Sequence, residues 1–210
     1  MLVKICGITR AGDAEAAAAA GANAVGFIFW PGSPRFIDPY RARRLARALP
    51  PFVTPVGVFV NQPIEYVNAV STLVGLGVVQ LHGDEPLDYV RAVRRPVLKA
   101  VSGANLAPDA VARWPLDVWL LVDAHDPVRR GGTGARADWT RAAALAAERP
   151  IVLAGGLGVD NIAEAVARVR PVGVDVSSGV EVSPGVKDHR RIAALFAQLA
   201  AAPAATGSRT

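Results

Sequence analysis

Residues 2–30, LVKICGITRAGDAEAAAAAGANAVGFIFW, contain the pattern that decides the fold. Two short apolar runs, at 2–6 and 24–30, flank an alanine-rich stretch around 11–20 that is typical of a helix. A strand, a helix and a second strand in this order form a unit in which the two strands lie parallel. The stretch therefore predicts one βαβ unit of a parallel sheet.

The same alternation continues along the chain. Further apolar runs lie at 52–60, 77–81, 96–101, 118–122, 150–154 and 172–176. Helical stretches follow the eight runs, around 11–20, 39–48, 62–74, 86–94, 105–113, 139–147, 159–168 and 187–201. The runs are nearly continuously apolar, as expected when both faces of a sheet are covered.

Eight such units predict the α/β class and a single-domain (β/α)8 TIM barrel over residues 1–200. The small and polar residues of 201–210 predict a frayed C-terminal tail. An open doubly wound sheet is the alternative fold. The first strand-to-helix turn, CGITRAG (6–12), argues against it because it lacks a dinucleotide-binding fingerprint.

Composition restricts the class of protein. The chain has 210 residues, of which 51% are apolar, so one sizeable core can be buried. It contains no apolar run of about 18 residues, so we expect no membrane span. The N-terminus lacks the features of a signal peptide, and one cysteine cannot form an internal disulfide. Both observations predict a reducing, cytoplasmic location.

The net charge of +5 comes from twenty arginines and only three lysines. The basic residues fall as pairs on predicted helices, at 43–44, 94–95 and 190–191, and form no single stripe interleaved with aromatic residues. This pattern favours solvated helix faces over a nucleic-acid surface. A mild positive field is still suited to recruiting an anionic small molecule.

In a TIM barrel the chemistry lies at the C-terminal ends of the strands. The residues that follow the eight runs are Cys6-Gly7, Pro31 to Arg35, Asn61, His82-Gly83, Val101-Ser102, Asp123, Gly155-Gly156 and Ser177-Ser178-Gly179. Most polar and reactive residues of the strands thus collect at one rim, whereas the opposite rim is mostly Pro, Gly and Ala. This asymmetry predicts a functional site.

Two loops at this rim predict a phosphate site. LAGGLGVDNI (153–162) and DVSSGVE (175–181) place glycine and serine directly after the seventh and eighth strands. Backbone amides in such loops can surround a phosphate, and barrels frequently bind phosphate at these two positions. We expect Gly155, Gly156, Ser177, Ser178 and Gly179 to contribute. The alternative is that the glycines serve only tight turns.

A third glycine-rich segment, RRGGTGARADW (129–139), follows the sixth strand. It is a candidate for a lid or for another wall of the phosphate site, with Gly132 as a further phosphate ligand. Taken alone, such a segment is a weak motif.

Asp123 follows the apolar run VWLLV (118–122) and is a candidate general acid. Partial burial raises the pKa of a carboxyl group and suits it to donate a proton. Leu121 and Asp123 share one side of the strand, so Asp123 points at the mouth if Leu121 points into the barrel. The alternative role is a helix or loop cap.

Asp175 lies inside an apolar strand, where a carboxylate needs a partner. Candidate partners are His82, Lys4 and Lys99. His82, with Gln80 on the same side of its strand, is a candidate site residue and equally a candidate structural histidine. We expect Lys4 and Lys99 to be interior charges paired with carboxylates. One cysteine and three scattered histidines show no ligand spacing, so we expect no metal.

Arg35 lies in WPGSPRFI (30–37), where Pro31, Gly32 and Pro34 stiffen the loop. A rigidly held guanidinium can grip a carboxylate bidentately. The alternative is that Arg35 is a solvent-exposed loop residue without a binding role.

Cys6 shares a strand face with Lys4, and a cation there favours a thiolate. Facing Asp123 across the mouth, such a thiolate would form a base–acid pair; otherwise Cys6 is a buried filler.

A set of short motifs runs collinearly from Val3 to about Leu199: VKICGIT (3–9), GANAVGFIF (21–29), SPR (33–35), VGVFVN (56–61), VQLHGDE (79–85), LAGGL (153–157), DVSSGVE (175–181) and SPGVKD (183–188). Together these motifs resemble those of phosphoribosylanthranilate isomerases. This resemblance covers nearly the whole chain. It implies a (β/α)8 barrel that carries out an Amadori rearrangement of N-(5′-phosphoribosyl)anthranilate in tryptophan biosynthesis, without cofactor or metal. Neither nucleic acid nor membrane is an expected partner, and a monomer or homodimer is expected.

By this resemblance Cys6 is the general base, Asp123 the general acid, and Arg35 the group that holds the anthranilate carboxylate. The glycine and serine loops, including Gly132, would hold the phosphate. His82 and Asp175 match positions near the site and are expected to contact substrate. Asp126 is a rival acid by position only, farther into the loop.

Three alternative functions remain at this point. A related histidine-pathway isomerase would use an aspartate base and a second phosphate loop, whereas the loop after the third strand is FVNQP (59–63). A non-catalytic phosphate binder on the same fold would not require both Cys6 and Asp123. A basic nucleic-acid binder would show a steep salt dependence.

Overall fold

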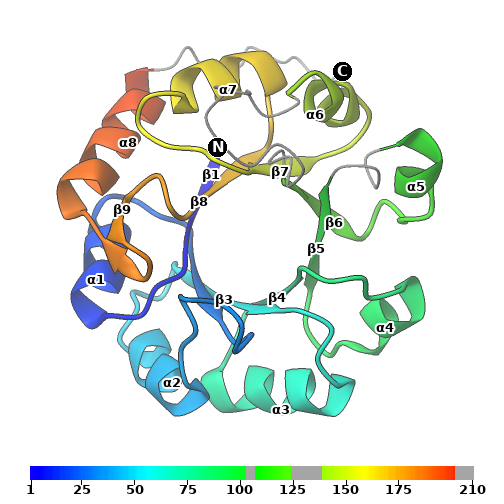
Figure 1. Ribbon diagram of the computed structural model, residues 1–210, viewed down its shortest axis with the longest axis horizontal. Helices are drawn as coiled ribbons and strands as arrows, with labels where there is room; N and C mark the ends of the chain where they lie inside the picture. The colour runs from blue at the N-terminus through cyan, green and yellow to red at the C-terminus, as the bar shows by residue number, and fades with distance from the viewer. Residues whose placement is uncertain (103–106, 124–138, 202–210) are drawn as a thin grey trace.

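Eight parallel strands close into a barrel in the computed structural model, which describes residues 1–102, 107–123 and 139–201. Strands that follow one another in the sequence are neighbours in the sheet, and β8 pairs with β1 to complete the ring (Figure 1). The strands are β1 Leu2–Cys6, β2 Ala24–Ile28, β3 Thr54–Phe59, β4 Val78–Leu81, β5 Val97–Ser102, β6 Trp119–Asp123, β7 Ile151–Ala154 and β8 Gly173–Val176. The predicted (β/α)8 barrel is confirmed, and a closed ring rules out the open sheet.

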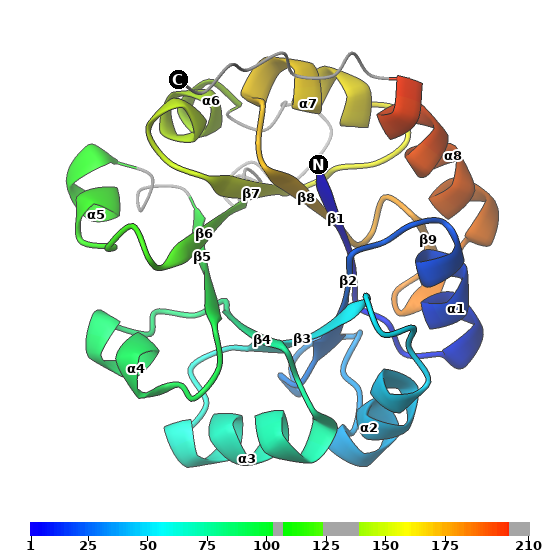
Figure 2. The ribbon, with the colours of Figure 1, turned by 180° about the vertical axis from the view of Figure 1, so that it is seen from behind.

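The helices form a ring outside the strands in both views (Figure 1, Figure 2). They are α1 Ala11–Ala19, α2 Pro39–Arg47, α3 Ile64–Val74, α4 Leu87–Ala92, α5 Pro108–Ala112, α6 Trp139–Glu148, α7 Ile162–Val169 and α8 His189–Ala201. Within the described ranges, no helix is both long and apolar enough to cross a membrane. Of the tail expected to fray, only Ala201 is described, and it belongs to α8.

A short hairpin that the sequence analysis did not predict lies between β8 and α8. It consists of β9, Glu181–Ser183, and β10, Val186–Lys187. Gly185 in its turn has a φ of +79°, a left-handed conformation that glycine adopts without strain. The dipeptide Pro184-Gly185 between two short runs is the signal that identifies such a turn. As a result, α8 begins two residues later than expected.

Local sequence explains the ends of two helices. Asp38 begins α2, because its carboxylate accepts hydrogen bonds from the backbone amides of Tyr40 at 2.9 Å and Arg41 at 3.2 Å. Pro39 follows at the first helical position, where its missing N–H is not needed. Gly75 ends α3 with a φ of +78°.

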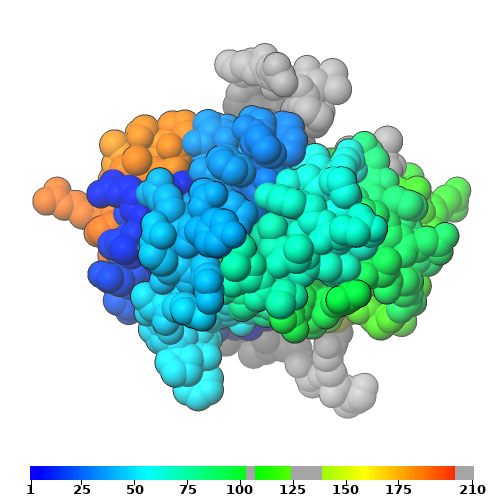
Figure 3. Space-filling view, turned by 90° about the horizontal axis from the view of Figure 1, so that it is seen from below, coloured from blue at the N-terminus to red at the C-terminus, as the bar shows by residue number. Residues whose placement is uncertain are grey.

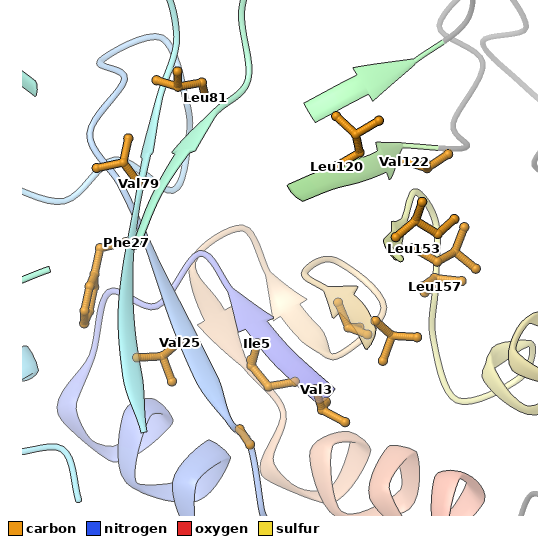
Figure 4. Close-up of a cluster of buried hydrophobic side chains, with 14 of the residues drawn as sticks. Val3, Ile5, Val25, Phe27, Val79, Leu81, Leu120, Val122, Leu153 and Leu157 are labelled. Atoms are coloured by element: carbon orange, nitrogen blue, oxygen red, sulfur yellow. The ribbon is translucent and has the colours of Figure 1, made fainter. Parts of the chain in front are cut away.

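Alternation along the strands separates two apolar layers. Outward-facing side chains such as Phe27, Leu81 and Leu153 pack between the barrel and the helices, and Figure 4 shows part of this larger cluster. Burial of each such side chain stabilises the fold by about 1.5–3 kcal/mol. A smaller inward-facing cluster consists of Leu98, Ala100, Leu121, Val152 and Ala154. The barrel interior is therefore packed, and polar groups accumulate at its C-terminal end.

Candidate active site

A cavity of about 410 Å³ opens at the C-terminal ends of the strands. It is lined by Cys6, Ile28, Arg35, Val58, Gln80, His82, Asp123, Ala154, Gly155, Gly156, Leu157, Asp175, Ser177 and Ser178. The predicted site residues are all among them except Gly179, which follows Ser178, and Gly132, which lies outside the described residues. Asp126, the rival acid, also lies outside them. The barrel thus brings together residues from both ends of the chain.

Cys6 ends β1 with its side chain buried. Gly26, its register partner on β2, leaves the necessary space, because a Cβ there would lie 2.7 Å from Cys6 Sγ and 3.2 Å from Lys4 Cε. Burial raises the pKa of the Cys6 thiol; the charge of Lys4 lowers it, and that of Asp175 raises it. The predicted influence of Lys4 in favour of the thiolate is present, and the effect of burial on the Cys6 pKa is larger.

Lys4 forms a buried ion pair with Asp175, at 2.8 Å between Nζ and Oδ1. The two side chains are 6% and 8% exposed, and the two residues are register partners on β1 and β8. Burial opposes the charged lysine, but attraction by Asp175 and Cys6 outweighs it and raises the Lys4 pKa. Lys4 is thus the partner among the three candidates, and its charge is shared between a carboxylate and the thiol.

Asp123 points at the mouth, as predicted from alternation, because Leu121 belongs to the inward-facing cluster. Its Oδ2 lies 3.5 Å from Nε2 of His82, and the Asp123 side chain is 25% exposed. The other ring nitrogen of His82, Nδ1, lies 3.0 Å from Nε2 of Gln80. His82 therefore faces the candidate acid rather than a structural partner outside the site.

Arg35 is held by Glu181 through one edge of its guanidinium. Nη2 lies 2.6 Å from Oε2, and Nε lies 2.9 and 3.1 Å from the two carboxylate oxygens. This hydrogen bonding raises the Arg35 pKa. The alternative of a solvated loop arginine is wrong. The Nε edge is occupied, so a substrate carboxylate could be bound only by the remaining donors, at Nη1 and the outer hydrogen of Nη2.

Sequence reasoning assigned no role to Glu181 or to Lys187, its second partner. Lys187 Nζ lies 2.8 Å from Glu181 Oε1 and 3.2 Å from the carbonyl oxygen of Ser177. Burial raises the Glu181 pKa, but hydrogen bonds from Arg35 and Lys187 outweigh it, so the pKa is lowered. For Lys187, burial prevails and its pKa is lowered. Both residues lie within the family motifs DVSSGVE and SPGVKD, and this position is the feature of the sequence that could have identified them as site residues.

The two glycine and serine loops lie side by side. Gly158 and Gly179 form an isolated parallel bridge, and a Cβ on Gly179 would collide with the Leu157 carbonyl and lie 2.6 Å from Gly158 Cα. Close packing thus explains Gly179. Gly156 differs, because its φ is +65° and a Cβ there would meet no atom within 4 Å. In the described part of the chain, no acceptor takes a hydrogen bond from the amides of Gly156 or Ser178.

Lys99 is buried, but it does not point into the barrel. Its Nζ lies 2.9 Å from Glu85 Oε2 and 2.5 Å from the Gly83 carbonyl oxygen. The neighbouring Ala100 faces the interior, so Lys99 faces the helices. The expectation of interior charges paired with carboxylates is therefore confirmed for both lysines, and Lys99, paired with the buried Glu85, holds the loop after β4. The residues that the structure describes contain no group of three potential metal ligands.

Comparison with known proteins identifies the family of this chain. Residues 3–198 match the family described as N-(5′-phosphoribosyl)anthranilate (PRA) isomerase. The chain belongs to the PRA isomerase family. It is 51% identical over 198 residues to the PRA isomerase of Citrifermentans bemidjiense, covering 93% of this chain and 95% of that relative.

Solved PRA isomerases share the barrel. The Thermotoga maritima structure has a TM-score of 0.86 at 43% identity, covering 94% of this chain and 98% of that one. A PRA isomerase in complex with reduced 1-(o-carboxyphenylamino)-1-deoxyribulose 5-phosphate has a TM-score of 0.83 at 41% identity, with the same coverage. Family membership confirms the predicted resemblance and makes this chain an isomerase of tryptophan biosynthesis. The histidine-pathway, binding-module and nucleic-acid alternatives are set aside.

Proposed function

We propose that this cavity converts N-(5′-phosphoribosyl)anthranilate into 1-(2-carboxyphenylamino)-1-deoxyribulose 5-phosphate, with Asp123 as acid and Cys6 as base. The observation that carries the assignment is that both groups line one cavity, between the paired glycine and serine loops and Arg35. A relative binds a reduced form of this product, which has a phosphate at one end and an aromatic carboxylate at the other. The cavity offers candidate groups for both anions.

Asp123 acts first in this scheme. Its carboxyl group gives a proton to the ribose ring oxygen, the C1′–oxygen bond breaks, and the nitrogen lone pair forms a protonated imine. Asp123 is then a carboxylate facing His82, with 3.5 Å between Oδ2 and Nε2. A general acid must lie within hydrogen-bond reach of the atom that it protonates, and the position of Asp123 in the cavity allows a bound ribose to meet this requirement.

Cys6 acts second. Its thiolate removes the proton from C2′, the electron pair moves toward the imine nitrogen, and the resulting enolamine tautomerises to the ketone. The imine serves as the electron sink, so this step needs no cofactor. Burial raises the thiol pKa, while Lys4 and Lys187 lower it. The positive charge of the imine adds a third cation at the moment when the thiolate is required.

The two anionic groups of the substrate fix its orientation. We assign the phosphate to the amides of Gly156 and Ser178, with Ser177 beside them, and the carboxylate to the free edge of Arg35. Asp175 keeps Lys4 beside the thiol. Holding the substrate at both ends keeps C2′ at one position beside the base, and this fixed orientation accelerates the proton transfer.

Growth of a tryptophan auxotroph that lacks its own PRA isomerase tests the proposed reaction. The wild-type chain should restore growth without tryptophan, and the Cys6→Ala variant, expressed at the same level, should not. Purified protein should convert enzymatically generated substrate in the presence of a metal chelator. Failure of the wild-type chain in both assays would refute the reaction, whereas growth with Cys6→Ala would refute only the role of the thiol.

We also infer that the partner of this chain is a second copy of itself. At the opposite end of the barrel lies a mainly apolar cavity of about 420 Å³, lined by strand starts that include Leu2, Val56, Val78 and Trp119. Phe52, just before β3, is 95% exposed, and the segment near residue 50 projects from this end (cyan, lower edge of Figure 3). A Thermotoga maritima relative, 40% identical with a TM-score of 0.82, is described as dimeric.

Insertion of Phe52 into the cavity of the other copy would remove both apolar surfaces from water, and each buried ring contributes about 1.5–3 kcal/mol. Sedimentation should then find a dimer for the wild-type chain and a monomer of unchanged specific activity for Phe52→Asp. A wild-type chain that sediments as a monomer at every concentration would exclude this arrangement. For either form we propose a cytoplasmic location, based on the single free cysteine.

A further inference from the structure

Gln80 is a buried amide for which the described residues provide one polar contact. It lies on β4, is 1% exposed, and has Val58 and Leu98 as register partners on the neighbouring strands. Its Nε2 lies 3.0 Å from Nδ1 of His82. Within the described residues, its Oε1 is buried and has no hydrogen-bond partner. An amide retained in an apolar layer with one atom unpaired requires an explanation.

The contact determines where His82 carries its proton. An amide nitrogen can only donate a hydrogen bond, so Nδ1 of His82 must accept it through a lone pair. A neutral histidine with a lone pair at Nδ1 carries its hydrogen at Nε2. That nitrogen faces Oδ2 of Asp123 at 3.5 Å.

Rotating the Gln80 amide by 180° gives a poorer arrangement. Its oxygen would then face Nδ1 and draw the hydrogen there, and a neutral His82 would turn a lone pair toward the Asp123 carboxylate. The amide nitrogen, with two hydrogens, would be the unpartnered atom instead of one oxygen. The observed orientation of the Gln80 amide leaves only its Oε1 without a partner among the described residues. It places a donor opposite Nδ1 of His82 and allows Nε2 to donate to Asp123.

We propose that Gln80 is a positioning residue that holds His82 as the neutral Nε2–H tautomer, so that His82 donates a hydrogen bond to the carboxylate left on Asp123 after proton transfer. The proposal rests on the proposed role of Asp123 as the acid. Catalytic hydrogen bonds are often long without substrate and shorten in the complex, which fits the 3.5 Å separation.

This tautomer also directs the proton of Asp123. A histidine with a lone pair at Nε2 could take that proton itself, because imidazole is a stronger base than a carboxylate. With Nε2 already protonated, His82 cannot compete with the ribose ring oxygen. The donated hydrogen bond then stabilises the Asp123 carboxylate until the proton returns. Gln80 thereby acts on the reaction through His82.

Nitrogen-15 NMR of histidine-labelled protein tests the tautomer directly. The chain has three histidines, so His82 can be assigned from the spectrum of a His82→Asn variant. In the wild-type protein at pH 8 we expect a pyrrole-like shift at Nε2 and a pyridine-like shift at Nδ1. A pyrrole-like Nδ1 with a pyridine-like Nε2 would overturn the proposal.

Two variants of Gln80 test whether a change in the His82 tautomer changes kcat. Gln80→Met keeps the length of the side chain and removes the donor, so His82 should become a mixture of tautomers while kcat falls about tenfold at unchanged KM. Gln80→Glu replaces the donor by an acceptor, so a proton should appear at Nδ1. If Gln80→Met is folded and shows the wild-type tautomer and the wild-type kcat, Gln80 has no positioning role.

Val79→Ala is the matched control for lost packing, because Val79 is the buried neighbour of Gln80 on β4 and packs in the outer cluster, away from both cavities. It should change neither the His82 shifts nor kcat. Asp123→Asn separates this proposal from the proposed function. Full turnover of that variant would refute Asp123 as the acid, whereas the His82 shifts of the wild-type protein would still report on Gln80.

Discussion

Replacing Asp175 by asparagine should destabilise the fold and make the Cys6 thiol easier to ionise. Asp175 lies 2.8 Å from Lys4, and the two side chains are 8% and 6% exposed. Removal of one partner from a buried pair costs about 3–5 kcal/mol. The asparagine oxygen can still accept a hydrogen bond from Lys4, so we expect the lower end, about 3 kcal/mol. For a chain of this size, that corresponds to a decrease in Tm of about 6–12 °C.

The same substitution that destabilises the fold should make the Cys6 thiol easier to ionise. The negative charge of Asp175 raises the Cys6 pKa, so its removal lowers that pKa. Among the described residues that influence Lys4, the Cys6 thiolate would then be its remaining anionic partner. The assay is the rate of alkylation by iodoacetamide as a function of pH, and Cys6 is the single cysteine of the chain, so the signal has one source. The midpoint for Asp175→Asn should lie at lower pH than that of the parent.

The pH dependence of stability supplies a further check. Lys4 has a folded-state pKa raised above 10.5, so the pair contributes fully below that pH and its contribution is lost as the pH rises through the folded-state pKa. The difference in Tm between parent and variant should be constant at neutral pH and decrease above about pH 10.5. Asp117→Asn, which breaks the exposed pair with Arg91, is the control and should leave Tm nearly unchanged. An unchanged Tm for Asp175→Asn, or a thiol titration displaced to higher pH, would refute the reasoning.

Three further predictions concern the proposed roles. Cys6→Ser should lower kcat by about 10²–10⁴ with little change in Tm, since a hydroxyl is too weak an acid to replace the thiolate; a near-parental kcat would make Cys6 a core filler. Arg35→Ala should raise KM more than it lowers kcat, because a carboxylate is held in both ground and transition states, and equal KM values for variant and parent would argue against the clamp. Crystals soaked in inorganic phosphate should show the anion on the amides of Gly156 and Ser178, and an empty site would contradict the phosphate assignment.

The fold could be predicted from local pattern alone. Apolar runs of strand length alternate with helical stretches, and parallel strands joined by helices have few ways to pack. The rim of the site followed from one further rule, that barrel chemistry lies at the C-terminal strand ends. Alternation along β6 also placed Asp123 at the mouth, because side chains two apart share a face. These inferences use only neighbours in the sequence.

Tertiary structure decided which charged groups pair. Lys4 meets Asp175 because β8 pairs with β1, although the two residues are 171 positions apart. The hairpin of β9 and β10 brings Glu181 to Arg35, which changes the edge of the guanidinium that remains available. No periodicity in the sequence encodes such a choice among partners, because it depends on the register of distant strands.

The sign of the Cys6 pKa shift also depends partly on the sequence and partly on the tertiary structure. From the sequence, a cation on the same strand face predicted a lowered pKa, and that contribution is present in the structure. Its balance against burial depends on how completely the barrel excludes water and on the nearby Asp175, which raises the pKa. Sequence determined the residue types, the strand faces and the rim. Only the folded barrel decided the solvent exposure and the distances between charges, because these depend on side chains brought together from all eight strands.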